Sequence, residues 1–423
     1  MEKFIVMGGN RLTGEITVNG AKNAILPIMA ASLITKGKST LFNVPIIQDV
    51  LVMQKVMEYL GAKVVLEGNV MFIDSEDVKP LDIHENLMRQ LRASNLVIGS
   101  LITRFRKIKV AFPGGCNIGS RPMDLHIKGL LAMGAKITEK YGYIEAEATN
   151  LHGCDILLDF PSVGATENLM MAAVLAEGTT IIRNAAREPE IIDLQNYLNA
   201  LGAKVRGAGL DTIKVDGVKE LNSSVEHTII PDRIEAGTHM IAAAITGGDV
   251  LIDKVIPDHL EPISAKLMEA GIGVTKYDDS IRVQGIKRPK AIDFKTLPFP
   301  GFPTDMQPQM MAMMTVADGT SIVSESIFEN RFKHIDELRR MGANIKLEGR
   351  VAIIKGVQSL SGAFVEATDL RAGAALVLAG LVAEDATVIE KVEYIDRGYE
   401  RLEAKYSSLG ARIIRVNNSR NGS

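Results

Sequence analysis

Leu60-Gly61-Ala62-Lys63-Val64 is the stretch that decides the fold, because close variants of it recur along the chain. The variants are Met133-Gly134-Ala135-Lys136-Ile137, Leu201-Gly202-Ala203-Lys204-Val205, Ala270-Gly271-Ile272-Gly273-Val274, Met341-Gly342-Ala343-Asn344-Ile345 and Leu409-Gly410-Ala411-Arg412-Ile413. Successive glycines of the set are 73, 68, 69, 71 and 68 residues apart. A period of roughly 70 residues is longer than that of the common solenoid repeats. It suits a small α/β unit that is used six times.

Each copy of this motif ends an amphipathic helix and begins a strand. Apolar residues recur at helical spacing between Val50 and Leu60. Gly61 suits the position after the helix, where a left-handed backbone is inexpensive for glycine alone. The apolar runs Val64–Leu66 and Val70–Ile73, separated by a glycine turn, predict two strands.

A second motif lies upstream in the unit, where a small-residue apolar helix leads through a turn into a strand. Examples are Ala30–Leu33 before Ser39–Phe42, Ala172–Leu175 before Thr179–Ile182, and Ala242–Ile245 before Val250–Ile252. The predicted unit is therefore helix, strand, helix, strand, strand, and the fold class is α/β. We expect the alanine-rich helices to be buried and surrounded by sheet.

The composition narrows the class of protein. The chain has 423 residues, 46% of them hydrophobic and 23% charged, as in ordinary globular proteins. A net charge of −3 argues against a broad basic surface for nucleic acid. The chain has two cysteines and no C-x-x-C or H-x-x-x-H pair, so we expect neither a disulfide framework nor a structural metal. Without a leader peptide or a long apolar run, we expect a cytoplasmic protein with no membrane segment.

The length predicts more than one compact unit. Six repeats could form a ring, a solenoid or two groups of three, and the length favours two domains of about 200 residues each. Glu220–Pro231, between the third and fourth repeats, is the expected crossover.

Polar residues precede the alanine-rich helix in each unit, in the segments Asn19–Asn23, Leu91–Ser94, Val163–Glu167, Asp232–Glu235, Thr304–Asp305 and Asp369–Gly373. One interpretation is that these residues are only N-caps. Capping does not explain the basic members Lys22, Arg92, Arg233 and Arg371. A helix N-terminus with an added cation is an anion-binding site, which is the second interpretation.

The loop after the first strand of each unit also carries charge, and its basic members are Arg121, Arg187, Arg331 and Arg397. If two three-unit domains faced each other, both sets of loops would converge on one cleft. A cleft rich in Arg and Lys suits a small, multiply charged substrate such as a phosphate ester, held by forked guanidinium contacts.

Two sulfur-containing segments have opposite interpretations. Cys116 lies in a loop with glycines at 114, 115 and 119, and nearby Arg121 favours its thiolate, so we weigh a reactive thiol against a structural one. The methionine cluster Met306, Met310, Met311, Met313 and Met314 is better explained as helix core.

With these residues in view, the chain resembles the enolpyruvyl transferase family over essentially its whole length, and within it the carboxyvinyl transferases that act on UDP-N-acetylglucosamine. The most specific segments of the resemblance are Asn19–Ala24, Pro113–Cys116, Gly119–His126, Arg187–Glu190 and Phe302–Gln307. The resemblance implies a two-domain inside-out α/β barrel with three repeats per domain. It also implies a discontinuous domain of residues 1–20 plus 230–423, and a domain of residues 21–229 that carries the Cys116 loop.

The resemblance further implies the reaction, in which the carboxyvinyl group of phosphoenolpyruvate moves to the 3′-hydroxyl of UDP-N-acetylglucosamine and phosphate is released, without a cofactor. Asp305 matches the base. Cys116 matches the proton donor and the thiol that the epoxide fosfomycin alkylates. The residues that match phosphoenolpyruvate contacts are Lys22, Asn23, Arg121, Arg331, Arg371 and Arg397. Those that match UDP-N-acetylglucosamine contacts are Arg92, Arg121, Pro122, Met123, Asp124, Leu125, Ser162, Val163, Gly164, Asp305 and Ile327.

Further cleft residues implied by the resemblance are Glu188, Asp232, Arg233 and Asp369, whereas Phe160 stands where some members have a basic residue. Two alternatives remain open. The sister enzyme that makes 5-enolpyruvylshikimate 3-phosphate normally has Ser-Lys-Ser where this chain has Ala21-Lys22-Asn23, and it lacks such a loop cysteine. A paralogue that only binds the nucleotide sugar would be expected to lack a key residue such as Lys22, Cys116, Asp305 or Arg397, and all four are present.

Overall fold

The structure is a computed structural model that describes residues 2–83, 96–111 and 123–417. These residues fold into two compact units. Unit 1 contains residues 2–19 and 231–417, and unit 2 contains residues 20–83, 96–111 and 123–230. The fold is mixed α/β, with many short strands and helices, as the sequence predicts.

The described part of unit 1 contains three four-stranded sheets that share one pairing pattern. In each, the first strand pairs in parallel and the other two pairings are antiparallel. In spatial order they are β2 (Thr13–Thr17), β14 (Asp249–Asp253), β16 (Ser280–Gln284) and β15 (Gly273–Lys276); β17 (Phe294–Lys295), β18 (Thr320–Ser324), β20 (Val351–Lys355) and β19 (Asn344–Glu348); and β22 (Phe364–Glu366), β24 (Ala386–Glu390), β1 (Glu2–Met7) and β25 (Arg412–Asn417). The short strands β21 (Leu360–Ser361) and β23 (Ala383–Glu384) pair separately.

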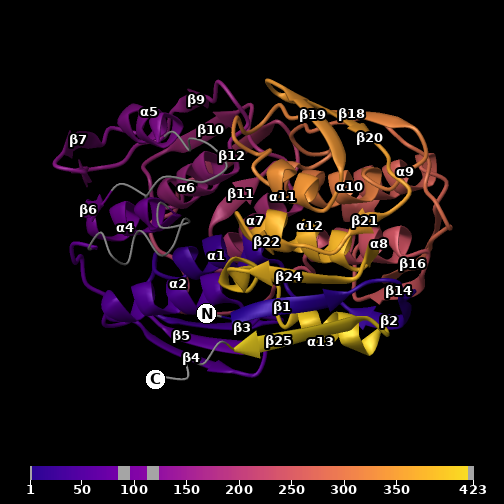
Figure 1. The fold of residues 1–423 in the computed structure, drawn as a ribbon. Helices are drawn as coiled ribbons and strands as arrows, with labels where there is room; N and C mark the ends of the chain where they lie inside the picture. The colour runs from indigo at the N-terminus through magenta and orange to yellow at the C-terminus, as the bar shows by residue number, and fades with distance from the viewer. Residues whose placement is uncertain (1, 84–95, 112–122, 418–423) are drawn as a thin grey trace. The chain divides into compact units, whose positions relative to one another are not determined.

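Strand β1 comes from the opposite end of the chain to its neighbours. It lies between β24 and β25 and pairs antiparallel with both, so that Ile5 is opposite Val388 on one side and Ile414 on the other. Figure 1 shows the indigo N-terminal strand between two yellow C-terminal strands. The last sheet of unit 1 is therefore completed by the first strand of the chain.

Unit 2 repeats the same pairing pattern. Its sheets, in spatial order, are β13 (Ser224–Thr228), β3 (Lys38–Phe42), β5 (Val70–Asp74) and β4 (Lys63–Glu67); β9 (Asp155–Leu157), β10 (Thr179–Arg183), β12 (Thr212–Asp216) and β11 (Lys204–Arg206); and β6 (Lys107–Ala111), β8 (Tyr143–Glu147) and β7 (Lys136–Lys140). In the last sheet, an isolated parallel bridge between Ile83 and Val110 stands where the other sheets have a parallel strand.

Three helices in each unit are buried on nearly every side. They are α8 (Arg233–Ile245), α10 (Gln307–Met314) and α12 (Leu370–Gly380) in unit 1, and α1 (Lys22–Ala31), α4 (Val97–Phe105) and α6 (Val163–Ala173) in unit 2. A helix that is apolar all round must be buried, and α12, with the sequence LRAGAALVLAG, has every residue buried. The five methionines at 306, 310, 311, 313 and 314 are fully buried, so the prediction of helix core is confirmed.

The remaining described helices bury one face only. They are α9 (Glu261–Glu269), α11 (Ile335–Arg340) and α13 (Leu402–Ser408) in unit 1, and α2 (Gln48–Tyr59), α5 (Asp124–Ala132) and α7 (Pro189–Ala200) in unit 2. In α9, for example, Ile263, Ser264 and Leu267 are buried while Glu261 and Glu269 are exposed. The 3₁₀ turns η2 (Pro257–Leu260), η3 (Thr304–Met306) and η4 (Val392–Tyr394) complete unit 1.

The six recurring glycines have the backbone that the sequence predicts. Gly61, Gly134, Gly202, Gly271, Gly342 and Gly410 have φ between +88° and +102°. Gly61 ends the turn after α2, and β4 begins two residues later, at Lys63. The order helix, strand, helix, strand, strand is confirmed in the described residues that begin at α1, α4, α6, α8 and α10. After α12 and α13 only β25 follows, and β1 takes the place of the last strand.

The expected crossover contains an element that the sequence analysis missed. Residues 224–228 form β13, which pairs in parallel with β3. Beyond it the chain passes from unit 2 to unit 1, next to the earlier passage at residues 19–20. Backbone hydrogen bonds link the two passages. Within unit 2, Ala21 N donates to Ile230 O at 2.7 Å, and within unit 1, Asp232 N donates to Asn19 O at 2.9 Å.

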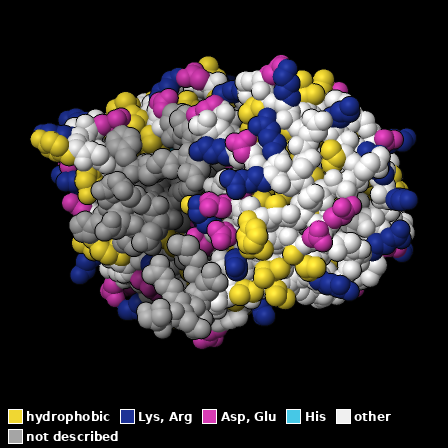
Figure 2. Space-filling model, viewed as in Figure 1, with side chains coloured by type: hydrophobic (Ala, Val, Ile, Leu, Met, Phe, Trp, Pro, Cys, Tyr) yellow, Lys and Arg dark blue, Asp and Glu magenta, His cyan; other side chains and the backbone are white. Residues whose placement is uncertain are grey.

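The outer surface mixes charge of both signs. On the face in Figure 2, described Lys and Arg side chains are interspersed with Asp and Glu. Hydrophobic side chains gather over the region of β24, β1 and β25. Exposed hydrophobic residues of this sheet are Phe364 on β22, Ile414 on β25 and Met7 on β1. Within the described ranges, no helix has both the length and the apolar character needed to cross a bilayer.

We predict that alanine substitutions at two recurring glycines of unit 2 differ in cost. Gly202→Ala adds a Cβ whose nearest atoms belong to the Asn222 side chain at 3.4 Å, so the main cost is the positive φ, about 1–2 kcal/mol. Gly61→Ala adds a Cβ only 2.7 Å from the carbonyl oxygen of Asp77, and therefore also strains the backbone. Urea denaturation should show the larger loss for Gly61→Ala, and equal losses would contradict the close approach.

Candidate active site

The three buried helices of unit 1 have their N-termini at one end of the unit. Asp305, just before α10, contacts Arg371 in the first turn of α12. At the other end, Thr246, Val316 and Leu381, which follow α8, α10 and α12, line one cavity. Since helix N-termini carry partial positive charge, this end of unit 1 favours anions.

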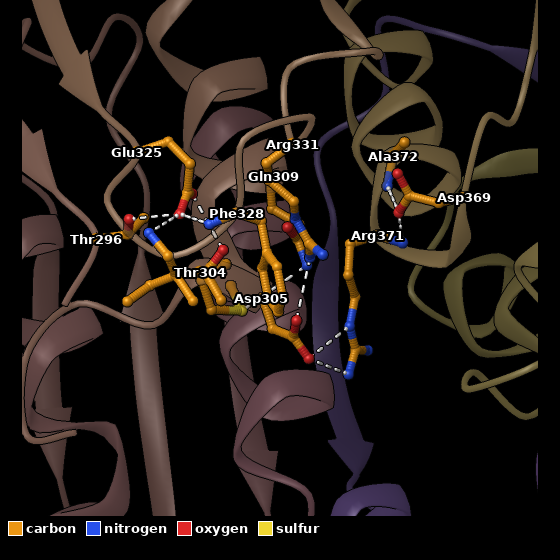
Figure 3. A network of polar contacts seen from close by, with 12 residues as sticks. Thr296, Thr304, Asp305, Gln309, Glu325, Phe328, Arg331, Asp369, Arg371 and Ala372 are labelled. Carbon is orange, nitrogen blue, oxygen red and sulfur yellow. Dashed lines mark hydrogen bonds and ion pairs between the residues drawn. The ribbon is translucent and has the colours of Figure 1, made fainter. Parts of the chain in front are cut away.

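Asp305 is shared by two arginines. Arg331 Nη2 donates to Asp305 Oδ1 at 3.1 Å, and Arg371 donates to Oδ2 from Nη2 at 3.0 Å and from Nε at 3.3 Å (Figure 3). Both guanidinium side chains are only 2% exposed, whereas Asp305 is 27% exposed. The carboxylate is therefore the accessible member of a buried cluster with one negative and two positive groups.

Each of the two arginines has a buried nitrogen that makes no hydrogen bond to the described residues. These nitrogens are Arg331 Nε and Arg371 Nη1. Buried polar groups are nearly always paired, so an unpaired guanidinium N–H calls for an explanation. An anionic ligand would supply the missing acceptor.

The charge of Arg371 is maintained by its surroundings. Burial alone would lower the pKa of Arg371, but Tyr399, Asp305 and Asp232 raise it above the usual value. The guanidinium carbon lies 5.4 Å from the centre of the Tyr399 ring. Arg371 therefore remains a cation despite its burial.

Asp369 and Asp232 are N-caps, which is the first of the two interpretations given above for the polar residues before the buried helices. Asp369 Oδ1 accepts from the backbone N–H groups of Arg371 and Ala372 (Figure 3), and Asp232 Oδ1 accepts from those of Ile234 and Glu235. These bonds fix the first turns of α12 and α8. Capping therefore explains why Asp232 and Asp369 are present. It does not explain the basic side chains beside them, Arg233 and Arg371.

Arg233 and Arg397 also lie in unit 1. Arg233 is buried, with its guanidinium carbon 5.6 Å from the centre of the Phe299 ring. Arg397 lies in the turn after η4 and is partly buried. Ile327, a predicted sugar contact, follows β18 and donates its backbone N–H to Glu325.

Two buried residues of this region were not found by the sequence analysis. Glu325 accepts hydrogen bonds from Thr296, Thr304, Ile327 and Phe328. His334 is fully buried; burial lowers its pKa to about 4, and Arg331 adds to this lowering, while Asp369 opposes it. His334 is therefore neutral at pH 7. A single acid after a strand and a single histidine before a helix give no pattern from which a site could be predicted.

In unit 2, Lys22 is the first residue of α1 and pairs with Asp49. Its Nζ lies 2.8 Å from Asp49 Oδ2, and the two side chains are 12% and 3% exposed. Asn23 follows and is half-buried. Because α1 has no side-chain N-cap, the free end of this helix and the lysine present positive charge together.

Those predicted nucleotide-sugar contacts of unit 2 that the structure describes lie at the starts of α5 and α6. Ser162 caps α6 by accepting from Ala165 N at 3.3 Å. Asn168 joins the helices, because its Oδ1 accepts from Gly99 N at 2.7 Å and its Nδ2 lies 3.0 Å from His126 Nδ1. Burial lowers the pKa of His126 to about 4, so this histidine is neutral at pH 7.

The same arrangement places the remaining members of the predicted set. Val163 and Gly164 open α6, Asp124 and Leu125 open α5, and Met123 precedes them. Glu188 precedes α7, and Phe160 is exposed. Arg92, Cys116, Arg121 and Pro122 lie outside the described residues.

A carboxylate that supports the start of α8 gives a pH-dependent prediction. Glu235 is buried, and it accepts from Lys405 Nζ at 2.6 Å and from Asn19 N at 2.8 Å. Burial alone would raise the pKa of Glu235, but His239 and Lys405 lower it from 4.5 to about 2. Because the folded pKa lies below the unfolded one, ionised Glu235 stabilises the protein above about pH 4.5, by roughly 3 kcal/mol.

We predict that Glu235→Gln lowers the free energy of unfolding at pH 7, and that the difference from the wild type shrinks by more than half by pH 3. Thermal unfolding of both proteins across pH 3–7 measures the difference. A difference that stays constant over this range would contradict the lowered pKa.

Comparisons with known proteins identify the family of this chain. The model of the EPSP synthase (3-phosphoshikimate 1-carboxyvinyltransferase) family matches residues 6–406. UDP-N-acetylglucosamine 1-carboxyvinyltransferase 1 of Carboxydothermus hydrogenoformans is 58% identical over 417 residues, 99% of either chain. The protein of the same name from Symbiobacterium thermophilum is 57% identical over 421 residues, 98% of this chain and 95% of its own.

Solved structures agree on the fold. The enolpyruvyl transferase NikO from Streptomyces tendae has a TM-score of 0.89 at 23% identity, with 98% of this chain and 99% of its own covered. EPSP synthase from Acinetobacter baumannii has a TM-score of 0.77 at 20% identity, with coverage of 99% and 100%. The chain belongs to the EPSP synthase family of enolpyruvyl transferases, in the group of the UDP-N-acetylglucosamine 1-carboxyvinyltransferases.

Proposed function

We propose that this chain transfers the carboxyvinyl group of phosphoenolpyruvate to the 3′-hydroxyl of UDP-N-acetylglucosamine and releases phosphate, the first committed step of peptidoglycan synthesis. The observation that carries the proposal is the Asp305 cluster, in which one carboxylate lies between two buried guanidiniums that keep N–H groups in reserve. Relatives of matching length that bear the name of this reaction support it.

Phosphoenolpyruvate is the anion that we assign to these arginines. It carries a phosphate and a carboxylate, and guanidinium groups bind both through paired N–H donors. Besides Arg331 and Arg371, the family resemblance assigns Lys22, Asn23, Arg121 and Arg397 to this substrate. The ammonium group of Lys22 is held beside the start of α2 by its ion pair with Asp49.

UDP-N-acetylglucosamine is assigned to the helix starts of unit 2 and to two positions of unit 1. The resemblance gives Arg92, the Arg121–Leu125 segment and Ser162–Gly164 in unit 2, with Asp305 and Ile327 in unit 1. Neutral His126, buried beside Gly164, supports the shape of this region without adding charge.

The chemistry has two stages, and Asp305 acts in the first. A bond forms between the 3′-oxygen and C2 of phosphoenolpyruvate, the hydroxyl proton passes to Asp305, and C3 gains a proton. C3 then loses a proton, the bond from C2 to the phosphate oxygen breaks, and inorganic phosphate leaves. Positioned acids and bases of this kind contribute about 10²–10⁴-fold each.

Substrate binding also affects the base itself. In the structure, the negative charge of Asp305 is shared between Arg331 and Arg371. A phosphate or carboxylate bound to the same guanidiniums would compete for their positive charge and leave Asp305 a better proton acceptor. The cluster would then be active mainly when phosphoenolpyruvate is present.

We assign the proton donor to Cys116, which also makes its thiol the target of fosfomycin. This assignment rests on the family resemblance and on the glycine-rich sequence around the cysteine. We further infer that the six sheets with their helices are six repeats of about 70 residues in two inside-out barrels, 1–20 plus 230–423 and 21–229, and that the reaction takes place in the cytoplasm.

The first test is phosphate release from phosphoenolpyruvate with either UDP-N-acetylglucosamine or shikimate 3-phosphate as the acceptor. We expect release with the nucleotide sugar alone, and a loss of at least about 10²-fold in kcat for Asp305→Ala. Asp318→Ala, an exposed carboxylate of the same unit, should keep its rate within about twofold of the wild type. Release with shikimate 3-phosphate alone would assign the sister reaction, and no release with either acceptor would favour a protein that only binds the sugar.

The second test concerns the thiol. Cys116→Asp should retain turnover and lose inhibition by fosfomycin, because a carboxylic acid can donate a proton but is a poorer nucleophile toward an epoxide. Cys154→Ala is the matched control, since Cys154 is half-buried in unit 2 and burial raises the pKa of its thiol. Fosfomycin inhibition that persists in Cys116→Asp would overturn the alkylation assignment.

A further inference from the structure

Glu325 is a buried carboxylate with an unusual set of partners. It follows β18 and is 1% exposed. Its Oε1 accepts from Thr296 Oγ1 at 2.8 Å, Ile327 N at 2.8 Å and Phe328 N at 3.1 Å, and its Oε2 accepts from Thr304 Oγ1 at 3.0 Å (Figure 3). All four donors are neutral hydroxyl or backbone N–H groups.

These bonds tie together three segments that are distant in sequence. Thr296 follows β17, Thr304 opens the 3₁₀ turn η3, and residues 325–328 form the loop after β18. Asp305 is the next residue after Thr304, and Ile327 is the position assigned to the nucleotide sugar. One carboxylate therefore contacts both the segment of the base and the segment that contacts the acceptor.

We propose that Glu325 is a positioning residue for the transfer reaction, acting on Asp305 through Thr304 and on the acceptor through the backbone of residues 327–328. The inference rests on the proposed function. The side chain of Asp305 is held from one side by Arg331 and Arg371. The Thr304 bond to Glu325 supplies the second constraint.

The charge of Glu325 is needed for this arrangement. A carboxylate has about four acceptor sites on two oxygens, and it uses both oxygens here. Glutamine has the same shape but offers one acceptor oxygen, and its NH₂ group would face either Thr304 or the N–H groups of Ile327 and Phe328. Hydrogen bonds to an ionised acceptor are also about twice as strong as neutral ones.

We expect Glu325→Gln to fold and to lower kcat by roughly 10–100-fold, because a displacement of about 1 Å at the reacting groups can cost 10²-fold. The KM for UDP-N-acetylglucosamine should rise with it, since Ile327 shifts as well. The KM for phosphoenolpyruvate should change less, because Arg331 and Arg371 remain buried in place.

A matched pair of threonine variants separates positioning from stability. Thr304→Val removes the hydroxyl beside Asp305. Thr296→Val removes the hydroxyl that donates to Oε1 of Glu325 and accepts from Ser326 N at 2.9 Å. Because two hydrogen bonds are lost, Thr296→Val should destabilise the fold at least as much as Thr304→Val. We expect Thr304→Val to lose about tenfold in kcat and Thr304→Ser to restore it. Thr296→Val should lower the unfolding temperature with a change in kcat of less than about threefold.

Steady-state phosphate release with both substrates varied, together with thermal unfolding of each variant, decides the question. Losses of kcat that follow the unfolding temperature across both threonines, or an unaltered kcat in Glu325→Gln, would overturn the positioning role. A wild-type chain that shows no release dependent on UDP-N-acetylglucosamine would instead overturn the proposed function, and the inference with it.

Discussion

The structure of unit 1 depends on one electrostatic constraint, the burial of two guanidinium groups around a single carboxylate. Arg331 and Arg371 are almost completely removed from water, and removing charge from water costs several kcal/mol per ion unless it is paired. Asp305 offsets only part of this cost. The cations are nevertheless retained at the shared N-terminal end of three buried helices, where partial positive charge adds to theirs. An arrangement that stability alone would not favour is what one expects where an anionic substrate completes the set of charges.

The buried helices of unit 1 bring charged side chains to this site from their first turns. In α12, with the sequence LRAGAALVLAG, Arg371 in the first turn is the one polar side chain of the helix. The N-cap residues Asp232 and Asp369 fix the starts of α8 and α12. Arg233 and Arg371 lie next to these caps, in the first turns of the two helices. The starts of these core helices thus carry the charged groups of the candidate site.

Much of this could be predicted from the sequence, for reasons that are local. A glycine after an amphipathic helix requires a positive φ, so the six motifs gave the element order, and capping residues marked the buried helix starts. The missed features depend on contacts between distant segments. Strand β13 has one buried apolar residue, Val225, and is defined by its pairing with β3. Glu325 bonds to Thr296 and Thr304, 29 and 21 residues away, and no spacing rule links such residues.

The position of β1 has a consequence for the order of folding during synthesis. The described residues of unit 2 all come from one stretch of chain, between Gly20 and Ile230, so its sheets can pair as soon as that stretch has left the ribosome. Unit 1 cannot be completed in the same way, because Glu2–Met7 must pair with β24 and β25, which lie far later in the chain. Strand β1 is therefore made long before its partners, and contacts of such sequence separation form slowly. Throughout that interval, β1 is an apolar strand with two unpaired edges, a state in which newly made chains are open to capture by chaperones or by one another.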